Sequence, residues 1–184
     1  MLADSDFIRL TPDHPLKPFD CGKGDICEDL NDFFHNDAKA YLKQLLTVTY
    51  LFENSAHTIA FFSVLNDKIT IEDSGEQNFF NRLSRKSHIP NEKRWPSYPA
   101  VKVARLGVDL SYQRKKVGTE VLDFIKMMFT ERNKTGCRYI TVDAYNETEV
   151  TDFYLRNDFT FLTDSDKKDK TRLMYYDLMR WVPA

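Results

Sequence analysis

Cysteine is scarce in this chain, and the few cysteines present match no familiar metal-binding pattern. Three of them, Cys21, Cys27 and Cys137, occur among 184 residues. Their number is odd, and their spacing against the four histidines fits no zinc motif. We therefore expect no bound metal, and we expect the three thiols to be reduced, as is usual in the cytoplasm.

The chain also lacks long apolar runs, a secretory signal and an excess of positive charge. No stretch approaches the length that spans a membrane, and the first residues, MLADSDFIRLTPDH, carry acids where a signal peptide carries cations. The formal net charge of -2 argues against a general nucleic-acid binder, although it leaves a local basic face open. These absences predict a cytoplasmic protein that does not contact membranes.

What the chain does have is a composition typical of a globular protein. Hydrophobic residues make up 42% of it and aromatic residues 14%, and we find no internal repeat or low-complexity linker. The length suits one domain, 1–184, with a polar and basic insert at 66–99.

Hydrophobic periodicity predicts an α/β (α+β) fold in which strands and helices alternate through the middle of the chain. Strands are expected at 7–10, 45–52, 58–65, 101–109, 137–144, 159–162 and 172–179, and helices at 25–43, from 117 onward and at 147–156. Strand–helix–strand connections imply parallel pairing in the centre, with antiparallel strands at the sides. The prediction is one mixed sheet of about six or seven strands with flanking helices.

The insert at 66–99 is irregular and polar, with one helix expected around 76–85. Its cations are Arg82, Arg85, Lys86, Lys93 and Arg94, against the acids Glu76 and Glu92. Such a cluster is either a solvated surface loop or a basic lip over a substrate groove.

The strand at 101–109 changes the parity of its apolar positions. Val101 and Val103 are odd, whereas Ala104, Leu106 and Val108 are even. An inserted residue, a β-bulge, produces this change, and burial of the strand on both faces is the alternative. Both interpretations place the strand inside the sheet.

The segment SYQRKKVGTEV, residues 111–121, concentrates cations where a helix is expected to begin. Arg114, Lys115 and Lys116 precede Gly118, although positive charge at a helix N-terminus opposes the helix dipole. An anion bound to the backbone N–H groups of this turn would explain the cations. The alternative is an ordinary helix start without a ligand.

Several segments resemble the GNAT family of acyl-CoA N-acyltransferases. Residues 113–118, Gln-Arg-Lys-Lys-Val-Gly, are similar to the family's phosphate loop, Gln/Arg-x-x-Gly-x-Gly/Ala, with Lys116 in place of the first glycine. Asn146 followed by Phe153-Tyr154 resembles a later family segment, although Asp158-Phe159 stands where Gly-Phe is usual. The order of strands and helices is similar over nearly the whole chain.

Three further segments resemble the branch of acetyltransferase toxins that modify aminoacyl-tRNA. They are Phe19-Asp20-Cys21-Gly22 with Leu30-Asn31-Asp32-Phe33, the strand segment 104–109, and Val142-Asp143-Ala144. This resemblance implies an aminoacyl-tRNA acceptor, an antitoxin protein as partner, and a homodimer.

The family resemblance also implies roles for individual residues. The central strand would be bulged and splayed, so that acetyl-CoA lies between strands 101–109 and 138–144 and meets the backbone of Leu106, Gly107 and Val108. The pyrophosphate would bind at Gln113, Arg114, Lys115, Lys116, Val117, Gly118 and Thr119. Asn146 would hold the pantetheine or, alternatively, cap the helix at 147–156. Tyr154 would be the general acid or, alternatively, an ordinary core residue.

The sequence does not identify a general base. Glu53, His57 and Asp143 could each relay a proton through water, or be ordinary surface or capping residues. An α-amine, with a pKa near 8, could react without a strong base.

Three functions follow from these observations. The first is an acetyl-CoA-dependent N-acetyltransferase that acts on a primary amine, and the second is the toxin-type enzyme that acts on aminoacyl-tRNA. The third is a non-catalytic acyl-CoA-binding module, which Lys116 in place of glycine leaves open. Tyr154 argues against the third, because a binding module needs no proton donor.

Overall fold

The protein is described by a computed structural model that covers residues 2–70, 72–73, 96–131, 133 and 135–182. Its strands are β1 (Asp6–Arg9), β2 (Val48–Glu53), β3 (Thr58–Thr70), β4 (Ser97–Val108), β5 (Tyr139–Tyr145), β6 (Thr160–Phe161) and β7 (Thr171–Asp177). Its α-helices are α1 (Asp25–Asp32), α2 (Ala38–Lys43), α4 (Val117–Glu131) and α5 (Thr148–Arg156). A π-helix, Phe33–Asp37, joins α1 to α2, and 3-10 turns occur at Leu2–Asp4, Leu110–Tyr112 and Leu178–Arg180.

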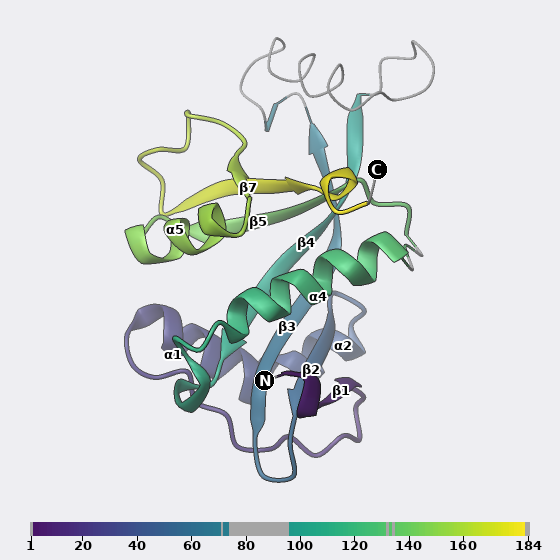
Figure 1. Cartoon of the computed structure of the whole chain (residues 1–184), viewed down its shortest axis with the longest axis vertical. Helices are drawn as coiled ribbons and strands as arrows, with labels where there is room; N and C mark the ends of the chain where they lie inside the picture. The colour runs from purple at the N-terminus through teal and green to yellow at the C-terminus, as the bar shows by residue number, and fades with distance from the viewer. Residues whose placement is uncertain (1, 71, 74–95, 132, 134, 183–184) are drawn as a thin grey trace. The chain divides into compact units, whose positions relative to one another are not determined.

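The strands form one mixed seven-stranded sheet in the order β1-β2-β3-β4-β5-β7-β6. All of them except β6 are labelled in Figure 1. β4 and β5 are parallel, whereas the pairs at the sides, β1–β2, β2–β3, β5–β7 and β6–β7, are antiparallel. The predicted α/β fold, with parallel pairing in the centre and antiparallel strands beside it, is confirmed.

Two compact units divide the chain. Unit 1 comprises Met1–Leu65 and Val103–Met127, and unit 2 comprises Asn66–Lys102 and Met128–Ala184. The chain therefore passes from one unit to the other within β3, within β4 and within α4.

Unit 1 contains the N-terminal strands and a core rich in phenylalanine. β2 and β3 form the predicted hairpin, with Val48 opposite Val64 and an irregularity in the register between Phe52 and Glu53. The buried cluster consists of Leu10, Phe19, Cys21, Phe33, Phe34, Ala38, Leu51 and Phe61. Gly107 of β4 belongs to this packing, because a Cβ there would lie only 2.6 Å from Cε1 of Phe61. The glycine is therefore required by the buried ring.

The helix predicted at 25–43 contains a π-helix at its centre. The backbone N–H of Ala38 bonds to the carbonyl of Phe33, five residues back, which widens the turn. The neighbouring residues Phe33 and Phe34 are both buried against the unit 1 core. Apolar spacing predicted a helix here but not its change of pitch.

Unit 2 is built around β5, which pairs on both sides. β5 is parallel to β4 where Ala100 to Lys102 lie opposite Tyr139 to Thr141, and it is antiparallel to β7 from Tyr139 to Tyr145. Ile69, Tyr98, Ala100, Tyr139 and Leu162 form the buried cluster. The bulge and splay predicted for β4 are not established by this pairing and remain predictions.

The insert predicted at 66–99 is shorter in the structure than in the prediction, because strands extend into both of its ends. β3 continues to Thr70 and β4 begins at Ser97, so strand residues occupy both ends of the irregular segment expected at 66–99. The helix expected at 76–85 and the cations Arg82, Arg85, Lys86, Lys93 and Arg94 lie outside the described residues.

Candidate active site

The anion loop, residues 109–117, joins β4 to α4 within unit 1, and side-chain hydrogen bonds fix its entrance. The Asp109 carboxylate accepts from the N–H of Ser111 at 2.9 Å and from the N–H of Asp20 at 3.1 Å. Nε2 of Gln113 donates to the carbonyls of Cys21 at 2.7 Å and Val108 at 3.0 Å. The amide of Gln113 therefore positions the loop.

Two residues of the anion loop have left-handed backbone conformations. The φ angles are 57° at Arg114 and 65° at Lys116. Lys116 replaces the first glycine of the family pattern yet keeps the conformation that glycine favours. The N–H groups of Val117 and Gly118, in the first turn of α4, have no acceptor within the helix and can bind an anion.

Three cations surround this turn. Arg114, Lys115 and Lys116 are exposed, and Nζ of Lys115 donates to the carbonyl of Ser111 at 2.8 Å. The same ammonium lies 5.7 Å from the centre of the Tyr112 ring. The cations and the helix N–H groups together suit a diphosphate.

Lys116→Gly is expected to stabilise the protein by about 1 kcal/mol, because a side chain in the left-handed region costs about that much and glycine avoids the cost. Denaturant unfolding measures the change. Lys115 is the matched control, since its φ is not positive and Lys115→Gly should be neutral or destabilising. A loss of stability in Lys116→Gly would show that its side chain contributes more than its strained backbone costs.

The segment at 19–24 braces the anion loop, a contact that sequence reasoning missed. The carbonyl of Asp20 accepts from the N–H of Leu110 at 2.8 Å. The Asp20 carboxylate accepts from the N–H of Gly22 and the amide of Asn31, both at 2.8 Å. The pKa of Asp20 is lowered, first by the Gly22 N–H and then by Asn31. Hydrogen bonds thus join segment 19–24 to residues 109–117, which lie far from it in the sequence.

The candidate bases of unit 1 have different surroundings. Glu53 is fully buried, accepts from Oγ1 of Thr58 at 3.0 Å, and pairs with Nζ of Lys17 at 3.2 Å and Nε2 of His14 at 3.3 Å. It is therefore not a surface residue. His57 is exposed in the turn between β2 and β3.

Asp143, the third candidate, is ion-paired in unit 2. Its carboxylate is exposed and accepts from Nζ of Lys102 at 2.8 Å. The same ammonium lies 3.7 Å from the carboxylate of Asp67, which also accepts from Oγ1 of Thr141. A proton taken by Asp143 would weaken its pairing with Lys102.

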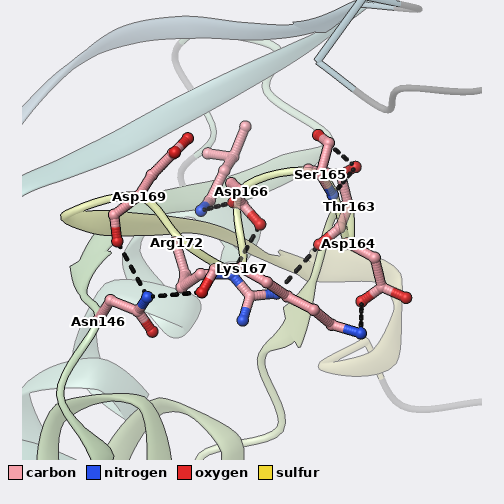
Figure 2. Close-up of polar contacts among 9 residues, drawn as sticks. Asn146, Thr163, Asp164, Ser165, Asp166, Lys167, Asp169 and Arg172 are labelled. Carbon is pink, nitrogen blue, oxygen red and sulfur yellow. Dashed lines mark hydrogen bonds and ion pairs between the residues drawn. The ribbon is translucent and has the colours of Figure 1, made fainter.

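Asn146 clamps the loop that precedes β7. Figure 2 shows its amide nitrogen donating to the carbonyls of Lys167 at 3.0 Å and Asp169 at 2.9 Å. The N-cap of α5 is Glu147, so the interpretation of Asn146 as the cap is wrong. A contact with pantetheine stays a prediction, for which the amide oxygen of Asn146 would serve as the acceptor.

Asp166, in the middle of the same loop, ties it to β7. Its carboxylate accepts from Nε of Arg172 at 2.6 Å and from the N–H of Leu173 at 2.7 Å (Figure 2). Arg172 also donates to the carbonyl of Thr163 and lies 4.1 Å over the Phe161 ring. These contacts fix the loop at 163–170.

Tyr154, the predicted general acid, lies on α5 among aromatic rings. Its ring centre is 5.1 Å from that of Phe153 and 5.4 Å from that of Phe159. Burial raises the pKa of Tyr154, so the hydroxyl is protonated at neutral pH. This protonation state suits an acid and equally suits a core residue.

Asp158, the second departure from a family glycine, also has a left-handed backbone. Its φ is 67°, and it follows Asn157, the C-cap of α5. The N–H of Phe159 bonds to the carbonyl of Tyr154 at 3.0 Å, which closes the helix end. The Arg180 guanidinium donates to the backbone and side-chain oxygens of Asp158 at 2.9 and 3.2 Å.

Neither a metal-binding cluster nor a membrane-spanning helix occurs in the described part of the chain. Within it, no three His, Cys, Asp or Glu side chains gather closely enough to hold a metal ion. Among the same residues, no helix is both long and apolar enough to cross a membrane.

No protein-family model matches this sequence, and no curated protein matches it significantly. Solved structures match it over almost its whole length. AtaT complexed with acetyl-methionyl-tRNAfMet is 16% identical with a TM-score of 0.75, and the match covers 97% of each chain. A tyrosine-to-phenylalanine mutant of KacT is 17% identical, with a TM-score of 0.73 over 96% of each chain. AtaTR bound with AcCoA is 17% identical, with a TM-score of 0.71 over 97% of this chain and 96% of that one. The GNAT-like fold predicted from the sequence is confirmed.

Proposed function

We propose that this chain, which has the fold of the toxin AtaT, is an acetyl-CoA-dependent N-acetyltransferase that acetylates a primary amine. The observation that carries the proposal is the match to AtaT over 97% of both chains at a TM-score of 0.75. AtaT structures contain acetyl-CoA and an acetylated methionyl-tRNA, a cosubstrate and a product of acetyl transfer. The three cations of the anion loop, Arg114, Lys115 and Lys116, support the same activity because they suit a cosubstrate that carries phosphates.

In this proposal the anion loop binds the pyrophosphate of acetyl-CoA. Arg114, Lys115 and Lys116 supply positive charge, and the N–H groups of Val117, Gly118 and Thr119 at the start of α4 supply hydrogen-bond donors. Gln113 holds the loop in place through the carbonyls of Cys21 and Val108. Backbone groups of Leu106, Gly107 and Val108 would bind the pantetheine amides.

Tyr154 would be the general acid. The acceptor amine attacks the thioester carbonyl, the C–S bond breaks, and the Tyr154 hydroxyl donates its proton to the departing thiolate. Because burial raises the pKa of Tyr154, its hydroxyl carries a proton at neutral pH. The amine loses its own proton to solvent or to a base.

The finer proposal concerns the acceptor, which we infer to be the α-amine of an aminoacyl-tRNA. The AtaT complex with acetyl-methionyl-tRNAfMet favours this acceptor over a small amine. An α-amine has a pKa near 8, so a substantial fraction is already neutral and reactive at physiological pH. An antitoxin partner belongs to the same proposal, since AtaT binds the C-terminus of the antitoxin AtaR.

The test is release of CoA from acetyl-CoA in the presence of a panel of amines, peptides and charged tRNAs. Mass spectrometry of the aminoacyl group identifies the acetylated product. Acetylation of a charged tRNA supports the finer proposal, whereas acetylation of amines alone supports only the acetyltransferase. CoA release that no acceptor stimulates would refute both.

Lys115→Glu combined with Lys116→Glu is expected to weaken acetyl-CoA binding about tenfold, or 1.4 kcal/mol, because two attractive charges become repulsive. Calorimetry measures the affinity. Lys167→Glu with Lys168→Glu is the matched control, since it changes the net charge equally in the exposed loop at 163–170. Unchanged affinity in the 115/116 variant would remove the pyrophosphate from this loop.

Replacement of Arg82, Arg85 and Lys86 by serine tests the basic insert, whose residues lie outside the described structure. If the insert contacts tRNA phosphates, the KM for a charged tRNA rises and its salt dependence becomes flatter. Acetyl-CoA affinity should not change. A KM equal to that of the unaltered protein at every salt concentration would exclude the insert from tRNA binding.

A further inference from the structure

Cys21 and Cys27 are joined by a pair of hydrogen bonds in the segment of unit 1 that leads into α1. Sγ of Cys21 donates to the carbonyl of Cys27 at 3.2 Å, and Sγ of Cys27 donates to the carbonyl of Cys21 at 3.1 Å. Both thiols are free, and Gly22 and Gly24, with φ of 105° and 101°, bend the chain between them. These reciprocal bonds hold each thiol against the backbone of the other cysteine.

The Cys21 carbonyl also belongs to the brace of the anion loop. Besides the Cys27 thiol, it accepts Nε2 of Gln113 at 2.7 Å. The N–H of Cys21 donates to the side chain of Asn31 at 3.0 Å. A chemical change at this pair of thiols therefore affects the Cys21 carbonyl, which also accepts the hydrogen bond from Gln113 of the anion loop.

We propose that Cys21 and Cys27 are an oxidation site, which a low-molecular-mass disulfide such as oxidised glutathione converts into an intramolecular disulfide. The Cys27 thiolate attacks one sulfur of the oxidant and releases the first thiolate. The Cys21 thiolate then attacks the Cys27 sulfur of the mixed disulfide and releases the second. Two protein thiols are oxidised, the oxidant is reduced to two thiols, and these carry the two protons.

Burial decides the order of the two steps. Cys21 is buried whereas Cys27 is half-buried, so Cys27 meets the oxidant first. Burial raises the pKa of Cys21 to about 12, which slows its attack at neutral pH. Closure of the disulfide should therefore accelerate as the pH is raised.

The disulfide would weaken the brace of the anion loop. Its formation removes both thiol hydrogen bonds and moves the Cys21 carbonyl relative to Gln113. We expect acetyl-CoA affinity to fall about fivefold, the effect of losing one ordinary hydrogen bond. This consequence rests on the proposed function, whereas the oxidation site itself does not.

The native full-length chain is incubated with oxidised glutathione, and the products are mapped by mass spectrometry after digestion. The expected product has lost two hydrogens, links Cys21 to Cys27, and returns to the dithiol with dithiothreitol. Cys137→Ser should form the same link, whereas Cys27→Ser, altered at the half-buried position, should form none. A persistent glutathione adduct on Cys27, reaction at Cys137 alone, or no reaction of the native protein would overturn the proposal.

Calorimetry with acetyl-CoA then compares the oxidised and reduced proteins. A disulfide that weakens binding supports the link to the anion loop, and equal affinities refute that link. If neither form binds acetyl-CoA, the proposed function fails, and the peptide map still decides whether the oxidation site exists.

Discussion

Tyr154→Phe is expected to lower kcat for acetyl transfer by about 10²–10⁴-fold, the usual contribution of a general acid. The change removes one hydroxyl and keeps the ring that packs against Phe153 and Phe159. Stability should therefore change little. Because burial raises the pKa of Tyr154, kcat should not decline through loss of this proton between about pH 7 and 10.

The measurement is CoA release with an acceptor that the panel has verified, together with thermal unfolding of each variant. Tyr139→Phe is the matched control, because it removes a hydroxyl from another buried tyrosine of unit 2. It should leave kcat within a few-fold of the original. If Tyr154→Phe retains most of its activity, another group protonates the thiolate.

Sequence patterns located the elements of the fold because those patterns are local. The stripe Val121, Leu122, Ile125, Met128 and Phe129 predicted one buried helical face, and all of these side chains except the half-buried Met128 are buried in α4. Such spacing follows from 3.6 residues per turn and needs no knowledge of distant partners. The strands were predicted on the same local ground.

Features that depend on distant partners could not be predicted from the sequence. Nothing near Asn146 indicates that it clamps the loop at 163–170, because that loop comes much later in the chain. A local pattern suggested an N-cap, which is wrong. Likewise, the link from Asp20 to the anion loop at 109–117 joins segments that only folding brings together.

The two departures from the family pattern show what a local comparison can miss. Lys116 and Asp158 each replace a glycine, which in the sequence suggests that the backbone has changed. Both residues instead keep left-handed φ angles, 65° and 67°. Each residue has the backbone conformation that glycine favours, so Lys116 in place of glycine is no argument for a non-catalytic module.

Glu53→Ala is expected to lower the free energy of unfolding by about 3 kcal/mol, the effect of breaking a buried ion pair from one side. The fully buried carboxylate accepts from Thr58 and pairs with Lys17 and His14. Alanine would remove the acceptor that these donors share and would open a cavity beside them. Urea unfolding measures the loss.

Glu53→Gln separates this structural role from a role as general base. Glutamine keeps the shape and one acceptor oxygen, so its cost should be smaller than that of alanine, while kcat at saturating substrates should remain unchanged. Lys17→Met is the matched control, because it removes the other charge of a pair in which only Glu53 is fully buried. The buried carboxylate of Glu53 then loses the charge of Lys17 while Thr58 and His14 remain as partners, and stability should fall again. A Glu53→Gln protein that unfolds normally but has lost turnover would instead make Glu53 the base.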